Sequence, residues 1–217
     1  PLEQAAARQA LQAWASVARL SLSEVSADAG QGSLRFAFTG APALGGTTYA
    51  YSDFPMNTAS AADTFLNARF VFPDGWAPGS QNFLTLMHEL GHALGLKHPH
   101  DRGMTGELPG WPATPATLAT AEGHALRDYC TSDTVMAYND VPGVEGVNAD
   151  FAPTTPMRLD IAALQFVYGA NLDYNAGDTV YRFTTGQRVN QTIWDGGGTD
   201  TLEVTGDGRS VIHLAPG

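Results

Sequence analysis

The segment that most constrains the fold of this chain lies near its middle and reads His88-Glu89-Leu90-Gly91-His92-Ala93-Leu94-Gly95-Leu96-Lys97-His98. Apolar residues recur at helical spacing around it and predict a helix over 81–96. His88 and His92 are four residues apart on that helix, so both imidazoles project from one face and can reach one ion. Gly95 can adopt a left-handed conformation that ends the helix, and His98 then returns to the same ion. The spacing therefore predicts a three-histidine metal site.

Glu89 lies between the first two histidines in sequence, and we expect it at the rim of the site without being a ligand. Zinc held by three nitrogens keeps a fourth position for water and lowers the pKa of that water to about 7. A carboxylate beside the water can take up its proton as the oxygen attacks a polarised carbonyl. The predicted chemistry is therefore zinc-dependent hydrolysis of internal peptide bonds, with Glu89 as the general base.

A different interpretation of the same residues is a non-catalytic module that binds zinc and calcium, such as a domain of a surface or adhesin protein. Structural zinc sites are usually closed by four ligands, often cysteines, whereas three histidines leave one position open. Cys130 is the only cysteine of the chain, which excludes an internal disulfide framework. The open coordination position favours the enzyme over the module.

The overall charge restricts the partners of this chain. It carries 22 acidic and 11 basic residues, a formal net charge of −11. Phosphates would be repelled by such a surface, so neither nucleic acid nor anionic lipid is expected as a main partner. Asp outnumbers Glu by 15 to 7, which favours turns and oxygen-ligand cation sites over solvated helix faces. No apolar run approaches the roughly 18 residues that a membrane span requires.

Hydrophobic periodicity elsewhere predicts an α+β fold with a small twisted mixed sheet. Helical spacing indicates a long N-terminal helix over 3–20, a C-terminal helix over 155–168 and a short helix over 117–128. Near alternation of apolar residues indicates strands around 20–25, 34–38, 49–51 and 70–72. A final segment rich in Gly and Asp contains brief strands at 179–183 and 201–204.

A second motif follows the histidines and reads Thr134-Val135-Met136-Ala137-Tyr138. Together with the zinc signature it resembles the tight methionine turn of the metzincin metallopeptidases. The resemblance implies that Met136 forms an apolar floor beneath the metal. Tyrosine at the position of Tyr138 is typical of serralysins and astacins, where it is an extra zinc ligand at rest and then helps to stabilise the tetrahedral intermediate.

Two further segments are similar to the serralysin branch rather than to the astacin-like or matrixin-like branches. Pro99 directly follows the third histidine, and residues 160–171 are similar to the C-terminal helix of the serralysin catalytic domain. In this family an edge strand pairs with the extended substrate. The resemblance therefore implies that Tyr49 and Tyr51 contact the substrate peptide.

The segment Asp195-Gly196-Gly197-Gly198-Thr199-Asp200 places two carboxylates five residues apart around a glycine turn, which suits a hard cation. It resembles the glycine-rich aspartate turns of calcium-binding β-rolls. In serralysins a matching segment binds calcium together with an earlier turn. The ligands that this implies are Asn175, Gly177, Thr179, Asp195, Gly197 and Asp200. The family usually has Arg where Asn175 stands, a change that a backbone carbonyl ligand tolerates. The alternative is a plain glycine-rich hairpin that binds no cation.

These patterns predict two parts, a metzincin zinc-peptidase domain over 1–170 and a calcium-binding junction over 171–217 that leads toward a truncated β-roll. Metzincin sheets normally have a strand before the first long helix, so we expect a fragment or another segment in that place. His100, His124 and Cys130 lie in a segment that does not match the family, and we expect them to be incidental.

The resemblance also implies a location, an oligomeric state and partners for the protein. It implies a secreted, extracellular bacterial enzyme exported without a signal peptide. It further implies a monomer that acts on protein or peptide substrates and meets a dedicated protein inhibitor.

Overall fold

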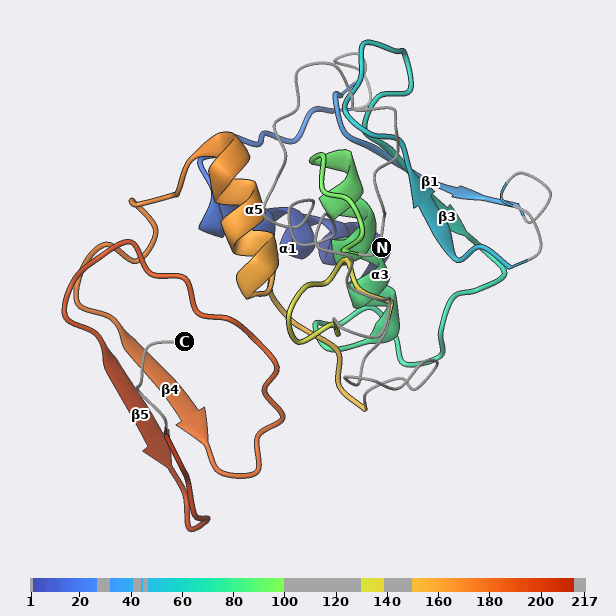
Figure 1. Ribbon diagram of the computed structural model, residues 1–217. Coiled ribbons are helices and arrows are strands. Elements are labelled where there is room, and N and C mark those ends of the chain that lie inside the picture. The colour runs from blue at the N-terminus through green and yellow to red at the C-terminus, as the bar shows by residue number, and fades with distance from the viewer. Residues whose placement is uncertain are drawn as a thin grey trace.

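The computed structural model describes residues 2–26, 32–40, 44, 47–99, 130–138 and 150–212. These residues form helices packed beside a small sheet, and a separate pair of strands (Figure 1). The helices are α1 (Leu2–Val17), α3 (Gln81–Ala93) and α5 (Arg158–Tyr168). The strands are β1 (Arg35–Thr39), β2 (Ala50–Ser52), β3 (Asp63–Asn67), β4 (Val180–Thr184) and β5 (Thr201–Thr205). The predicted α+β class is confirmed.

The hydrophobic core lies where α1 and α5 pack against α3, with α1 running behind the other two helices in Figure 1. Its α1 face consists of Ala6, Ala10, Trp14 and Val17, which are all buried. Trp14 donates a hydrogen bond from Nε1 to the carbonyl of Met87 over 3.3 Å, so the indole loses no polar partner on burial. The core thus fixes α3, which carries the first two histidines, from behind.

The three-stranded sheet has the order β1-β3-β2. β1 pairs with β3 in parallel, and β2 pairs with β3 antiparallel, with Ser52 opposite Thr64. Along β2 the side chains alternate strictly: Ala50 and Ser52 are buried and Tyr51 is exposed. β2 contacts α3, so the buried face of this edge strand is turned toward the helix of the zinc signature.

Several predicted elements differ from the structure. Residues 20–25 and 70–72 alternate in hydrophobicity but form no strand, because alternation specifies a face and not a hydrogen-bonding partner. The N-terminal helix ends at Val17 rather than at 20, since Ala18 bridges to Ala170 and Arg19 donates to the Gly169 carbonyl. The C-terminal helix begins at Arg158, not 155. The short helix predicted over 117–128 lies outside the described residues.

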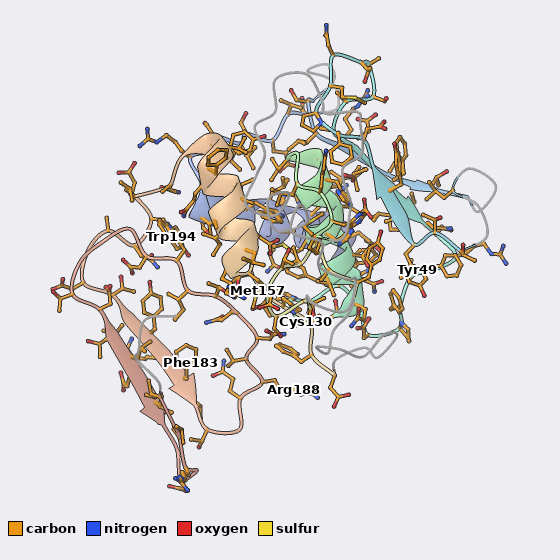
Figure 2. The ribbon with its side chains drawn as sticks, in the orientation of Figure 1. Tyr49, Cys130, Met157, Phe183, Arg188 and Trp194 are labelled. Carbon is orange, nitrogen blue, oxygen red and sulfur yellow. The ribbon has the colours of Figure 1, made fainter. Side chains whose placement is uncertain are left out.

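β4 and β5 form a parallel pair at the positions where short strands were predicted. They lie apart from the helices in Figure 1, and Phe183 of β4 lies well away from the core in Figure 2. The intervening chain returns to the rest of the structure at Trp194, whose Nε1 donates to the Asn171 carbonyl over 2.8 Å. Among the described residues, no helix is long and apolar enough to cross a membrane.

Candidate active site

The helix of the zinc signature begins and ends where local chemistry requires. Ser80 caps its start by accepting a hydrogen bond from the Phe83 amide over 3.1 Å. The helix ends at Ala93, earlier than the predicted 96, and Gly95 follows with φ of +98°. That left-handed conformation was predicted, and only glycine adopts it without strain. The chain reverses there and brings the third histidine back toward the helix.

The three predicted histidines converge. His88 Nε2 and His92 Nε2 lie 3.1 and 3.0 Å from His98 Nε2. They are the one group of at least three potential His, Cys, Asp or Glu metal ligands within the part of the chain that the structure describes. Nitrogens bound to tetrahedral zinc at about 2.05 Å lie about 3.3 Å from one another. Shifts of a few tenths of an ångström in the Nε2 positions would therefore accommodate the ion.

Backbone carbonyls fix which nitrogen of each helical histidine faces the centre. His88 Nδ1 lies 2.8 Å from the Val135 carbonyl, and His92 Nδ1 lies 2.8 Å from the Leu96 carbonyl. A carbonyl can only accept, so each Nδ1 carries the proton and each Nε2 presents its lone pair to the centre. Three converging histidine nitrogens form a donor set that zinc prefers, and the residues therefore fit the ion.

Glu89 is buried beside the triad with 6% of its surface exposed. Burial raises the pKa of its carboxyl to about 7, against a hydrogen bond from the Ser52 hydroxyl that lowers it. Its Oε2 is buried without a hydrogen-bond partner. A buried carboxylate oxygen without a partner costs free energy, so such an oxygen indicates that a bound molecule supplies the missing hydrogen bond. Glu89 therefore has the environment expected of a base that acts on a molecule bound at the histidines.

Met136 packs against the helix that carries His88 and His92. It is fully buried, and a Cβ on Gly91 would collide with its Sδ, so the methionine packs against the helix between His88 and His92. The carbonyl of Val135, the residue before it, is the acceptor that orients His88. This position fits the apolar floor implied by the resemblance.

Asp160 of α5 holds this turn in place, a role that the sequence reasoning missed. Its carboxylate accepts from the Thr134 hydroxyl at 2.5 Å and from the Val135 and Met157 amides at 2.8 Å each. It is completely buried, and burial raises its pKa to about 6 against the lowering effect of those three bonds. No sequence signal singles it out, because two of its three donors, Thr134 and Val135, lie about 25 residues away in the chain.

Tyr138 is more than half exposed and lies over the histidines. Its ring centroid is 5.6 Å from that of His88 and 4.6 Å from that of His98. Phe54, which the sequence did not point to, contacts the other side of the triad with its ring centroid 5.4 Å from that of His92. Two aromatic rings therefore flank the site.

The two tyrosines predicted to contact substrate differ in position. Tyr51 lies on the exposed face of β2, and its hydroxyl donates to Asp53 over 2.7 Å. Tyr49 precedes β2 and packs its ring edge-on against Phe70 and Phe72 (Figure 2). Tyr51 is thus on the edge strand beside the zinc helix, whereas Tyr49 belongs to an aromatic cluster at the strand's end.

Cys130 is buried where the segment of the methionine turn meets the start of α5, near Met157 in Figure 2. Its thiol lies 3.5 Å from Asp133, and burial raises its pKa. It is absent from the group of converging metal ligands among the described residues. His100 and His124 lie outside the described residues.

The two turns of the predicted calcium site come together. The Thr179 amide donates to Asp200 over 3.0 Å, and reciprocally the Thr199 amide donates to Asp178 over 2.8 Å. A Cβ on Gly198 would lie only 2.6 Å from the Gly177 carbonyl carbon, so the turns touch through their glycines. Asp195 accepts from the Tyr181 hydroxyl at 2.5 Å and from the Gly197 amide at 2.8 Å. Asn175 has a left-handed φ of +50° and donates to the same tyrosine hydroxyl.

Comparison with known proteins shows which peptidases this chain is similar to. The matrixin peptidase family model matches residues 2–106, a stretch that includes α1, α3 and His98. The chain is 31% identical to metalloprotease AprA of Pseudomonas entomophila over 94% of its own length and 44% of that relative. It is 32% identical to serralysin of Photorhabdus laumondii over 94% of the chain and 43% of the relative. Serralysin C of Dickeya chrysanthemi is 31% identical over 92% and 43%. The chain thus spans less than half the length of these relatives, and it is similar to serralysin-type metallopeptidases over 92–94% of its own length.

Proposed function

We propose that this chain is the catalytic part of a zinc metalloendopeptidase that cuts internal bonds of extended polypeptides. One observation carries the proposal: three histidine Nε2 atoms converge next to a buried glutamate whose Oε2 has no partner. A structural zinc site has no use for an adjacent unpaired carboxylate, whereas a hydrolase requires one as a base.

The residues divide the work as follows. Zinc bound by the histidines would polarise the substrate carbonyl and acidify the attacking water. Glu89 accepts the proton of that water on its free oxygen and returns it to the leaving amine, which a carboxyl with a raised pKa does readily. In this proposal Tyr138, whose ring lies near those of His88 and His98, donates a hydrogen bond toward charge that develops on the carbonyl oxygen.

The substrate backbone pairs with the edge strand β2 in this proposal. Among the described strands, β2 is at an edge of the sheet and contacts the zinc helix. An extended peptide laid against β2 would run past the triad, with Tyr51 on the exposed face. Tyr49 would contact the peptide only beyond the end of β2.

The test is hydrolysis of a denatured protein substrate such as casein by the purified chain. We expect activity that a zinc chelator abolishes and that added zinc restores. Glu89→Ala should retain zinc and lose activity by about 10²-fold or more, the range that positioned acid–base groups contribute. Arg69→Lys, an exposed change away from the triad, serves as the control variant purified and assayed in parallel. Zinc binding without hydrolysis would favour the non-catalytic module, and activity that survives in Glu89→Ala would refute the mechanism.

Further parts of the proposal come from the relatives named serralysin. We extend to this chain a secreted location in a bacterium, export without a signal peptide, a monomeric state and inhibition by a dedicated protein. Detection of the protein in culture medium, or only in cell lysate, decides the location. The calcium ligands Asn175, Gly177, Thr179, Asp195, Gly197 and Asp200 belong to the proposal as well, and so does the division into residues 1–170 and 171–217.

A further inference from the structure

An aromatic ring and a carboxylate lie together on the outer face of the edge strand. Tyr51 of β2 is 49% exposed, and Asp53, which follows the strand, is partly exposed. The Tyr51 hydroxyl donates a hydrogen bond to Asp53 Oδ1 over 2.7 Å. Ala50 and Ser52 alternate with them and are buried on the opposite face. The two exposed side chains form one surface, which we call the Tyr51–Asp53 surface.

This surface continues the sheet toward the zinc site. The Asp53 amide donates to the Asp63 carbonyl over 2.9 Å, and the Ala62 amide donates to the Phe54 carbonyl over 3.4 Å, so pairing with β3 extends past the end of β2. Alternation places Phe54 on the face opposite to Asp53. There its ring centroid lies 5.4 Å from that of His92. Asp53 is therefore one residue away from a side chain that contacts the triad.

The negative charge of Asp53 is not neutralised by the protein around it. Arg35, the basic residue of β1, is paired with Asp63 at 2.6 Å. Over the ranges that the structure describes, no basic side chain forms an ion pair with Asp53, and its one side-chain hydrogen bond is with the neutral phenol. Two carboxylate oxygens can accept several hydrogen bonds. The carboxylate can therefore accept from a positive group that arrives with a ligand.

A peptide paired with β2 would bring one of its side chains to this surface. Directly opposite residues of an antiparallel pair have their side chains on the same face, with Cβ atoms about 5 Å apart. A substrate that presents a carbonyl to the triad while it pairs with β2 thus presents a nearby side chain to Tyr51 and Asp53. The net charge of −11 also favours the approach of cationic peptides over acidic ones.

We propose that the Tyr51–Asp53 surface selects substrates that carry a cationic side chain, arginine above all, close to the cleaved bond. The proposal rests on the proposed function, in which the substrate pairs with β2. A guanidinium group can stack on the tyrosine ring and donate to the carboxylate at the same time, because its donors lie in the plane of the group. The lysine ammonium group is a point charge without such a plane, and a neutral side chain leaves the charge of Asp53 unpaired.

The test uses peptides with one arginine at successive positions around a single cleavable bond. Each is compared with the same peptide that carries citrulline, the neutral isostere of arginine. For the wild type we expect kcat/KM to favour arginine about fivefold at one position, the size that an exposed charge pair and a cation–π contact supply together. Asp53→Asn should reduce this ratio to about one through a higher KM for the arginine peptide. Tyr51→Leu, which removes the ring, should leave a ratio of about two.

Asp207→Asn is the matched control, because it removes the same charge from the exposed turn after β5. The fivefold ratio should persist in this variant, and its loss there would assign the preference to net charge and overturn the proposal. A wild-type ratio of about one at every position would also overturn it. So would a ratio that Asp53→Asn leaves unchanged.

Binding to Glu89→Ala separates this proposal from the proposed function. Fluorescence anisotropy of the same labelled peptides gives Kd with arginine and with citrulline in a variant that should not cut them. Tighter binding of the arginine peptide, lost when Asp53→Asn is added, would support the surface even if the wild type cut no peptide, a result that would refute the proposed function. Cleavage that depends on Glu89 but shows no arginine preference would refute this inference alone.

Discussion

At the scale of single residues, Gly91 is the position where packing and metal binding meet most closely. A methyl group there would collide with Met136 Sδ and approach the Trp14 ring. Alanine gains about 1 kcal/mol in helix propensity over glycine, but overpacking a buried site costs about 1–3 kcal/mol. We therefore predict that Gly91→Ala lowers the free energy of unfolding by about 1 kcal/mol and weakens zinc binding, as measured by chemical denaturation and metal titration.

The control for this prediction removes the other partner of the collision. Met136→Ala leaves space for the added methyl group, so Gly91→Ala should cost less in that background than in the wild type. Equal costs in both backgrounds would show that the methionine is not what restricts this position. Gly177→Ala, where a Cβ meets no atom within 4 Å, should leave zinc affinity unchanged.

Individual residues were predictable where their chemistry is local in sequence. The three histidines, Glu89 and Gly95 follow from spacing on one helix and its end, and the structure brings them together. Ser52 and Asp160 could not be predicted, because Thr64, Thr134 and Val135, to which they bond, come from other parts of the fold. A serine in a short strand or an aspartate in a helix is ordinary until tertiary contacts show what it bonds.

At the scale of elements, hydrophobic pattern found the helices and failed on part of the sheet. β3 was missed because it reads Asp63-Thr64-Phe65-Leu66-Asn67, with polar residues on its buried positions. Those polar groups have specific partners: Asp63 pairs with Arg35, Thr64 with Ser52, and Asn67 with the Thr48 carbonyl. Buried polar residues that are satisfied across strands remove the alternation on which strand prediction depends.

The joint between α5 and the methionine turn gives a prediction about pH. The folded-state pKa of Asp160 is about 6, above the ordinary value of 3.8, so the folded protein binds its proton more tightly than the unfolded chain. The stability that this proton contributes is complete below the unfolded pKa and is lost as pH rises through 6. Between pH 5 and 7.5 the wild type should therefore lose about 1 kcal/mol relative to Asp160→Asn.

Chemical denaturation of both proteins across this range, with a chelator present in each, measures the difference. The chelator removes zinc from both samples, so histidine protonation cancels in the comparison. Asparagine keeps the shape of the side chain and one acceptor oxygen, so the variant should fold. A constant difference in unfolding free energy between pH 5 and 7.5 would contradict the assignment to Asp160.

At the scale of the whole molecule, the segment from Asn171 onward is joined to the rest by polar contacts and by Trp194, which packs against the hydrophobic core. Asn171 donates to the Ala15 carbonyl and accepts from Trp194, while the Thr154 amide donates to the Asn190 carbonyl. Beyond them, β4 and β5 are a two-stranded parallel pair with most side chains partly or fully exposed. Such a pair is marginal alone, so its order depends on what holds the turns at its ends.

Calcium is the candidate for holding those turns, and its effect on the whole molecule is measurable. A ligand at 100 times its dissociation constant stabilises the folded state by about 2.7 kcal/mol, which raises Tm by about 5 °C or more in a domain of this size. We predict that calcium raises the Tm of the wild type by this amount and that Asp195→Asn loses most of the shift. Asp207→Asn removes the same charge from the exposed turn after β5 and should keep the calcium-dependent rise in Tm.

The hydrogen bonds that Asp195 accepts from Tyr181 and Gly197 exist without the ion. If Asp195 were purely structural, Asp195→Asn would therefore lower Tm equally with and without calcium. That equal loss is the result that would contradict calcium binding at this junction.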